Sequence, residues 1–346
     1  MHATLNALPT AAVIAVALVA LVATLGASEV LVRGVGRLAR NIGMLGGLVG
    51  LIVALCADAP ELSSSGAAIA NGSAATAAGV VFGSNVFNIA ILLGGAALAR
   101  GELRIHRAVV MLDAGVAIAV TLAVGGSAVG AIPVIMGWVL MLVVFVPYVL
   151  FLVLRPRTVA RLPLPARVHA LLATASSEAG MEGDELEAEL EEFGGAVAAP
   201  RSWRPVVLMA PSLAIIVLGA TLVVQSSLVL GARWGVPTVL VGVTALAAAT
   251  SLPNAYAAIR LAVDGLGAAV VSATFNSNTL NLIAGIAVPL LFVPGLGAAV
   301  PPSYIVWLLA MSVLAVVLVV RRLTRSGAVT LLVAYAAFVA YAVATA

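Results

Sequence analysis

Two carboxylates and a proline interrupt an apolar stretch early in the chain, at Ala57-Asp58-Ala59-Pro60-Glu61. The flanking residues 42–56 and 66–70 are apolar enough to lie within a membrane, so both acids fall near the middle of the bilayer. A charge there costs about 2.5–3.5 kcal/mol and is expected to face a protein interior or a wet cavity. Pro60 removes a backbone donor and breaks the helix beside the acids. Carboxylates beside a broken membrane helix predict a cation-binding site.

The same pattern returns 193 residues later in the chain. The Ala57–Glu61 stretch, the first box, is matched by Thr250-Ser251-Leu252-Pro253-Asn254. A second box is repeated at the same offset, as Gly83-Ser84-Asn85-Val86-Phe87-Asn88 and Asn276-Ser277-Asn278-Thr279-Leu280-Asn281. From proline to serine the two boxes are 24 positions apart in both copies. So many preserved spacings indicate an internal repeat, with copies at about 50–95 and 243–288.

The composition belongs to a membrane protein. Hydrophobic residues make up 63% of the chain, charged residues 9%, and the mean hydropathy is +1.21. A soluble domain carries about 25% charged residues, so that class is excluded. Hydropathy predicts an all-α membrane protein with ten spanning helices. Their expected ranges are 8–32, 42–70, 74–99, 107–125, 130–154, 203–231, 236–262, 267–293, 302–320 and 326–345.

The arginines predict the topology. When the predicted loops are assigned to alternate sides of the membrane, sixteen of the 17 basic residues fall on one side and Arg233 alone falls on the other. The positive-inside rule then places both termini outside and the 155–202 loop in the cytoplasm. We expect the membrane to be the plasma membrane of a bacterial cell. Five crossings separate the two repeat copies, so the copies enter the membrane from opposite sides. The first apolar stretch lacks the features of a signal peptide and is expected to remain as a helix.

Three units follow from this map. They are an N-terminal five-helix half (1–154), a cytoplasmic loop (155–202) and a C-terminal five-helix half (203–346). Residues 178–192 of the loop hold eight of the fourteen acids. This acidic segment is interpreted as a solvated linker between the halves, with a regulatory cation-sensing or docking segment as the alternative. It lacks the pattern of an EF-hand loop.

At the repeated boxes the sequence resembles the cation/calcium exchanger superfamily, the sodium/calcium exchanger-like membrane proteins. The two α-repeats of that family carry a Thr-Ser-x-Pro-Glu box followed by a Gly-Ser-Asn-x-Phe-Asn/Asp box. The resemblance implies ten helices in two inverted five-helix repeats, with broken helices at a central site between helices 2, 3, 7 and 8. It also implies antiport, in which calcium and its counter-ion compete for overlapping sites while helices 1 and 6 slide past the core.

The resemblance also implies site residues. The family's central acids fall on Glu61 and Asn254, with further oxygen ligands on Asn88 and Asn281. The expected ligands of a transported Ca²⁺ are Glu61, Asp58, Asn88, Asn254 and Asn281, where Asp58 is a second ligand or a proton acceptor. The whole candidate cation-binding set is Asp58, Glu61, Ser84, Asn85, Asn88, Thr250, Ser251, Asn254, Ser277, Asn278 and Asn281. The alternative is that the two acids bond neighbouring helices and bind nothing.

Two departures from the family pattern bear on the counter-ion. Asn254 stands where the family has its second glutamate, and Ala57-Asp58 replaces a Thr-Ser pair. In effect a carboxylate has moved from the second copy into the first. Close carboxylates share protons, so H⁺ is a candidate counter-ion. The loss of one hydroxyl and one glutamate weakens any site for several sodium ions.

These features predict a secondary active antiporter that exchanges Ca²⁺ for Na⁺ or H⁺ through a mid-membrane site. One alternative is proton-coupled exchange of another cation, K⁺, Na⁺ or Mg²⁺. A second alternative is a transport-inactive membrane sensor or scaffold. No enzymatic activity and no cofactor are expected, because nothing resembles a nucleotide-binding loop or a hydrolytic triad. The expected partners are inorganic cations and the lipid bilayer, without nucleotide or nucleic acid.

Overall fold

The computed structural model describes residues 2–41, 54–103, 105, 107–153 and 204–346 of the chain, and nearly all of these are helical. The α-helices are α1 (His2–Ala7), α2 (Thr10–Asn41), α4 (Ala59–Ala70), α5 (Ala74–Phe87), α6 (Gly94–Arg100), α7 (Arg107–Ala128), α8 (Val134–Val153), α11 (Arg204–Trp234), α12 (Thr238–Leu240), α13 (Ala247–Val263), α14 (Gly267–Leu282), α15 (Val288–Leu290), α16 (Pro302–Val320) and α17 (Arg325–Thr345). Three π-helical segments, η1 (Asn88–Leu93), η2 (Val241–Leu246) and η3 (Ile283–Ala287), and a 3₁₀ turn, η4 (Gly297–Ala299), complete the helical elements.

Eight helical stretches in the described part of the chain are long and apolar enough to cross a membrane. They match eight of the ten predicted spans, although α2 continues to Asn41, beyond the predicted end at 32. The predicted span 267–293 is helical from Gly267 to Leu290 but is not among the eight, because the polar run Asn276–Asn281 lowers its hydropathy. The predicted span 42–70 lies partly outside the described residues, as does the loop 155–202 with its acidic segment.

The helix carrying the two acids is interrupted at Asp58, as Pro60 predicts. Residues 54–57 are helical, Asp58 (φ −80°, ψ 0°) stands at the N-cap position, and α4 begins at Ala59. The second copy differs, because α13 runs through Pro253 without a break. The prediction of a broken helix is therefore wrong for the second copy. There the irregular backbone is the π-helical segment η2, which ends just before α13 begins. Such π-turns occur frequently at functional sites.

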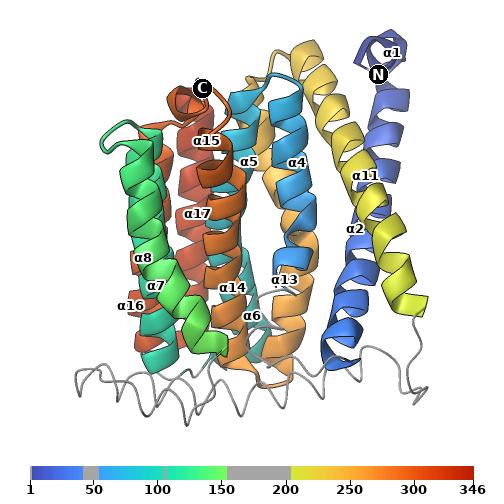
Figure 1. Ribbon diagram of the computed structural model, residues 1–346. Helices are drawn as coiled ribbons and strands as arrows, with labels where there is room; N and C mark the ends of the chain where they lie inside the picture. The colour runs from blue at the N-terminus through green and yellow to red at the C-terminus, as the bar shows by residue number, and fades with distance from the viewer. Residues whose placement is uncertain (1, 42–53, 104, 106, 154–203) are drawn as a thin grey trace.

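Figure 1 shows a bundle in which α2 and α11 pair along their length at one side of the other helices. Both chain termini lie at one end of the bundle. The opposite end is tied by a two-residue antiparallel ladder between β1 (Glu102–Leu103) and β2 (Leu323–Thr324). At that end Arg100 also donates to the carbonyl of Val263, over 2.8 Å. Arg233 lies instead at the end that holds the N-terminus, where it bonds Thr10 and the Leu8 carbonyl.

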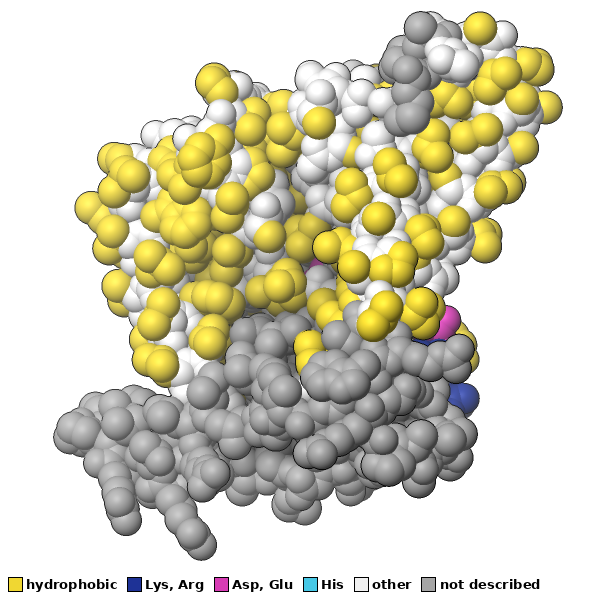
Figure 2. All heavy atoms as spheres, turned by 45° about the vertical axis from the view of Figure 1, so that its right-hand side comes forward, with side chains coloured by type: hydrophobic (Ala, Val, Ile, Leu, Met, Phe, Trp, Pro, Cys, Tyr) yellow, Lys and Arg dark blue, Asp and Glu magenta, His cyan; other side chains and the backbone are white. Residues whose placement is uncertain are grey.

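The outer surface is apolar. Val19, Val207 and Val143 have 65% or more of their area exposed, and Figure 2 shows one face of the molecule covered by hydrophobic side chains. In water such a surface would be unfavourable, whereas it suits the hydrocarbon of a bilayer. The polar side chains of the repeats are buried inside the bundle. This is the polarity expected of an integral membrane protein.

The two halves of the chain pack closely beside the repeats through glycines. A Cβ on Gly83 would lie 2.5 Å from the carbonyl oxygen of Val243, and one on Gly242 would lie 2.4 Å from that of Thr76. No side chain fits at these distances, so α5 and η2 are in backbone contact. In the second copy the position of Gly83 is taken by Asn276.

Candidate cation-binding site

Nine of the eleven predicted site residues form one connected hydrogen-bond network. All are buried, from 0% exposed for Asp58 to 8% for Asn254. The bonds join the start of α4, α5 and the first residue of η1 in the first copy to α13 and α14 of the second. The members are Asp58, Glu61, Asn85, Asn88, Ser251, Asn254, Ser277, Asn278 and Asn281.

The asparagines at the centre of the network bond in reciprocal pairs. The Nδ2 of Asn85 donates to the backbone carbonyl of Asn278 (3.1 Å), and the Nδ2 of Asn278 donates to that of Asn85 (3.0 Å). A second pair follows the same rule: Asn281 donates to Oδ1 of Asn85 (3.2 Å) and Asn88 to Oδ1 of Asn278 (3.3 Å). Within each pair, the second bond is obtained from the first by replacing both residues with their equivalents in the other copy, 193 positions away. The two copies therefore meet through an approximate two-fold relation.

The two acids are held by the second copy through a third reciprocal pair. Ser251 donates to Oε1 of Glu61 over 2.9 Å, and Asn254 donates to Oδ1 of Asp58 over 2.8 Å. At the 193-residue offset Ser251 is equivalent to Asp58 and Asn254 to Glu61. In this pair the first copy supplies both acceptors and the second copy both donors. Ser277 adds a further donor to Asp58 Oδ1 (2.6 Å).

Four oxygens of the network find no hydrogen-bond partner among the described residues. They are Oδ2 of Asp58, Oε2 of Glu61, and Oδ1 of both Asn88 and Asn281. A buried polar atom without a partner costs about 1–3 kcal/mol, so four in one network need an explanation. Carboxylate and amide oxygens are the ligands that hard cations such as Ca²⁺ take. The arrangement can therefore accept a cation, with two carboxylates and two neutral oxygens free to bind it.

Two predicted members lie outside the network. Ser84 donates to the Val81 carbonyl and Thr250 to that of Leu246, so both hydroxyls satisfy the backbone of their own helix. Glu29, which lies outside the predicted set, forms an ion pair with Arg33 on the exposed side of α2.

One buried carboxylate belongs to a separate polar group. Asp113 on α7 bonds Tyr148 on α8 and Ser272 on α14, and Tyr148 also bonds Asn276. None of Asp113, Tyr148 and Ser272 belongs to the predicted site set. The one local signal was Asn276, which stands where the first copy has Gly83.

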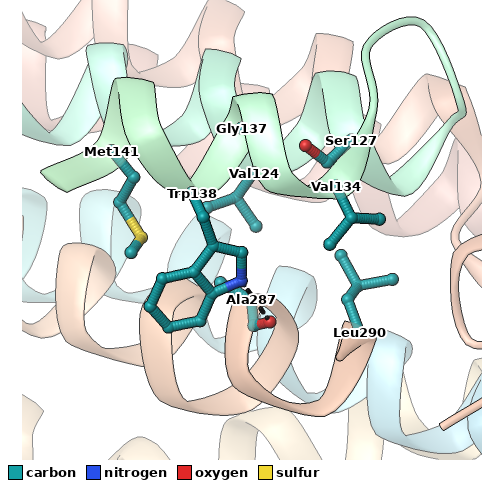
Figure 3. A pocket seen from close by; sticks show the side chains of 8 residues that line it. All are labelled: Val124, Ser127, Val134, Gly137, Trp138, Met141, Ala287 and Leu290. Carbon is teal, nitrogen blue, oxygen red and sulfur yellow. Dashed lines mark hydrogen bonds between the residues drawn. The ribbon is translucent and has the colours of Figure 1, made fainter. Parts of the chain in front are cut away.

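A small cavity between α7, α8 and η3 lies elsewhere and has a different character. It is lined largely by apolar side chains, among them Val124, Met141 and Leu290 (Figure 3). Among the lining residues, Trp138 Nε1 donates to the carbonyl of Ala287 over 3.1 Å, and the Ser127 hydroxyl donates to the Ala123 carbonyl of its own helix. The Ala287 carbonyl ends a π-helical segment, so the indole satisfies an acceptor that the irregular helix leaves open. The lining offers no charged group and does not resemble a cation site.

The described residues contain no group of three histidine, cysteine, aspartate or glutamate side chains placed to hold a metal. Amide and hydroxyl groups therefore have to complete any cation site built on Asp58 and Glu61. Neutral amide and hydroxyl ligands of this kind suit a cation that binds reversibly.

The sequence profile described as sodium/calcium exchanger protein matches residues 12–155 and 204–344. The chain belongs to the sodium/calcium exchanger protein family.

Known relatives are similar over different shares of this exchanger-family chain. The putative antiporter CaxA of Alkalimonas amylolytica is 25% identical over 329 residues, which are 94% of this chain and 95% of CaxA. Human sodium/potassium/calcium exchanger 4 is 35% identical over 127 residues, 33% of this chain and a fifth (20%) of the human protein.

Solved structures share the fold. A structure of the sodium-calcium exchanger NCX_Mj soaked with Na⁺ and Sr²⁺ matches 96% of this chain and 99% of its own, with a TM-score of 0.61 and 20% sequence identity. A second NCX_Mj structure, soaked with less Sr²⁺, gives a TM-score of 0.60 over the same shares. At such identity the likeness concerns the fold alone. The family is one of membrane transporters, in agreement with the apolar helices.

Proposed function

We propose that this protein is a secondary active antiporter that moves Ca²⁺ in exchange for H⁺ or Na⁺ through the network around Asp58 and Glu61. The observation that carries the proposal is the set of four buried, unpartnered oxygens on Asp58, Glu61, Asn88 and Asn281. In this proposal Glu61 is the principal ligand, Asp58 the second, and the amide oxygens complete the site. Asn254 and Ser251 hold the two carboxylates at the positions described above.

The charge of the network fits H⁺ as the counter-ion and disfavours exchange for three or more Na⁺. Asp58 and Glu61 are its only acids, so the pair is neutralised by one Ca²⁺, by two protons or by two Na⁺. A third sodium ion would leave excess positive charge in a buried site, which is unfavourable in a low dielectric. Both acids also lie at the start of α4, Asp58 at its N-cap and Glu61 in its first turn, where neighbouring carboxylates titrate as a coupled pair.

The repeat arrangement supports alternating access as the transport mechanism. In this proposal residues 1–154 and 203–346 form two inverted five-helix halves, and the network lies where the halves meet. The reciprocal bonds between the copies support such a relation. The end bearing Arg100, Arg321 and Arg325 would face the cytoplasm, with both termini outside. Figure 1 shows these helix ends opposite the termini.

Uptake of radioactive calcium into proteoliposomes tests the proposal. Purified protein would be given a pH gradient and, separately, a Na⁺ gradient. Uptake driven by the pH gradient and lost in Glu61→Gln supports both the site and the counter-ion. Uptake driven by Na⁺ alone would keep the site and change the counter-ion. If folded, inserted protein takes up no calcium under either gradient, the calcium assignment is wrong.

The chain offers a matched control for the site variants. Ser84→Ala removes a polar atom from the same repeat motif, but its hydroxyl bonds only its own helix. Transport is therefore expected to survive Ser84→Ala and to fail in Glu61→Gln and Asp58→Asn. Equal losses in all three variants would point to a general structural defect instead of a binding site.

A further inference from the structure

Asp113 is a buried carboxylate that the proposed transport site does not use. It lies on α7, within a stretch long and apolar enough to span a membrane, and is 5% exposed. Tyr148 OH lies 2.9 Å from Asp113 Oδ1 and 2.6 Å from Asn276 Oδ1, and the Ser272 hydroxyl bonds Asp113 Oδ2. The group thus joins three helices, α7, α8 and α14.

The described elements that make the most extensive contacts with α7 present no positive charge to Asp113. They are α8, α14, η3, α16 and η4, and their only titratable side chains are Tyr148 and Tyr304. On α7 itself the nearest charged residue is Arg107, six residues away and exposed. A bare carboxylate inside a membrane span without a cationic partner is strongly disfavoured.

The hydrogen-bond geometry accounts for one additional proton. The Tyr148 hydroxyl has a single hydrogen, yet two acceptor-type oxygens lie within bonding distance of it. A proton on Asp113 Oδ1 resolves the conflict: Asp113 donates to Tyr148, and Tyr148 donates to Asn276. Ser272 then donates to Asp113 Oδ2. Every contact is satisfied and the group is neutral. An ionised Asp113 would require a reversed Asn276 amide and would leave a net charge buried.

This group has no counterpart related to it by the repeat. At the 193-residue offset, the positions of Asp113, Ser272 and Asn276 are taken by Val306, Gly79 and Gly83. Only Tyr148 has a like partner, Tyr341. The cluster therefore occurs once, between α7 and α8 of the first half and α14 of the second, and is no part of the shared scaffold.

We propose that Asp113 is a second proton-binding site, separate from the transport network, whose neutral form ties α7 and α8 to α14. Ser272 and Asn276 are one turn apart on α14, the helix that also carries Ser277, Asn278 and Asn281 into the network. Asp113 acts as a positioning residue for that helix. Loss of its proton removes the donor to Tyr148 and places a charge against α14. The consequence for transport rests on the proposed antiport function, whereas proton binding itself does not.

Infrared spectroscopy of the purified protein tests proton binding without any transport assay. At neutral pH the wild type is expected to show a protonated-carboxyl band that disappears in Asp113→Asn. Tyr148→Phe should shift that band, because the hydroxyl that accepts the hydrogen bond from Asp113 is removed. Asp58→Asn and Glu61→Gln identify the bands of the network acids. If no band is lost in Asp113→Asn, Asp113 is ionised and the proposal is overturned.

The pH profile of calcium uptake then tests the positioning role. Asp113→Asn mimics the neutral acid, so uptake at neutral pH should stay within about fivefold of the wild type, the size of one lost hydrogen bond. At alkaline pH, Asp113→Asn should retain uptake that the wild type loses. Asp113→Leu, which cannot bond Tyr148, should reduce uptake at every pH. Loss of uptake in Asp113→Asn with an unchanged pH profile would overturn the role.

Discussion

The two copies of the repeat agree in their scaffold and differ in their chemistry. Both use the asparagines of the second box to bond the opposite copy, with nearly equal distances in each direction (3.1 and 3.0 Å). Yet both acids of the network lie in the first copy, and the second copy supplies neutral donors to them. The backbone and amide contacts preserve the two-fold relation, and the charges do not.

Local structure follows the same division. The first copy has its helix interrupted at Asp58 and keeps Gly83 for backbone contact with Val243. The second copy has a continuous α13 and carries Asn276 in place of that glycine. The comparison teaches that packing between the halves is shared, whereas the carboxylates of the network are not. Asp58 and Glu61 belong to the first copy, and the second copy offers Ser251 and Asn254 at the equivalent positions.

The largest expected effect comes from moving a carboxylate between the copies. Glu61→Asn should lower calcium uptake by about 100-fold, because removing one buried charged partner costs about 2–5 kcal/mol. Adding Asn254→Glu should restore part of the activity, since Asn254 Nδ2 lies 3.4 Å from Glu61 Oε1 and occupies the equivalent position. Uptake in proteoliposomes measures both. No recovery in the double variant would show that the copies are not interchangeable at this position.

A second exchange sharpens the contrast with the family pattern. Asp58→Ser combined with Asn254→Glu keeps two acids but gives each copy one of them. Separating the acids should weaken proton sharing, so Na⁺-driven uptake should gain on pH-driven uptake by a few-fold. The ratio of the two uptake rates in one vesicle preparation is the measurement. An unchanged ratio would mean that the placement of the acids does not select the counter-ion.

The pairing of both acids on one helix predicts a steep pH dependence of calcium binding. A protonated carboxylate cannot bind the cation, so apparent affinity falls as pH falls, by about tenfold per pH unit for each competing proton. Two coupled acids should give a limiting slope near two protons, and Asp58→Asn a slope near one. Calcium titration of detergent-solubilised protein at several pH values measures the slope. Equal slopes in the two proteins would contradict proton sharing.

The smallest effect tests the shared scaffold. Asn85→Ala and Asn278→Ala each remove one donor of a reciprocal pair and should destabilise the protein equally, by about 1–3 kcal/mol. Thermal unfolding in detergent compares the two variants, with Ser84→Ala as a control that touches only its own helix. Clearly unequal losses would show that the two bonds, although alike in geometry, contribute unequally to the stability of the protein.

Much of this arrangement could be predicted from the sequence because its signals are local. The repeated boxes identify nine residues that meet in one network, and their spacing requires no knowledge of the contacts. The interruption at Asp58 follows from Pro60 in the same way. Proline alone does not decide the outcome, however, since Pro253 leaves α13 continuous. The tertiary surroundings determine whether a helix tolerates the missing donor.

Other features depended on contacts that no sequence spacing encodes. Ser84 and Thr250 belong to the repeated boxes, but their hydroxyls bond the backbone carbonyls of preceding residues. The side-chain rotamer decides this, and the sequence does not specify it. Asp113, Tyr148 and Ser272 lie on three different helices and meet only after those helices pack. The span over 267–293, predicted from hydropathy, is not among the eight apolar stretches, because its polar run lowers its mean hydropathy.

The reciprocal asparagine bonds have a consequence for the history of the molecule. A contact in which residue i meets j and j meets i is the signature of an isologous interface between identical subunits. In a homodimer of such subunits every substitution appears twice, so the centre would contain both acids in duplicate or none at all. Joining the subunits in one polypeptide removes that restriction. A fused chain can keep the symmetric contacts of a homodimer while gathering Asp58 and Glu61 in one of its halves.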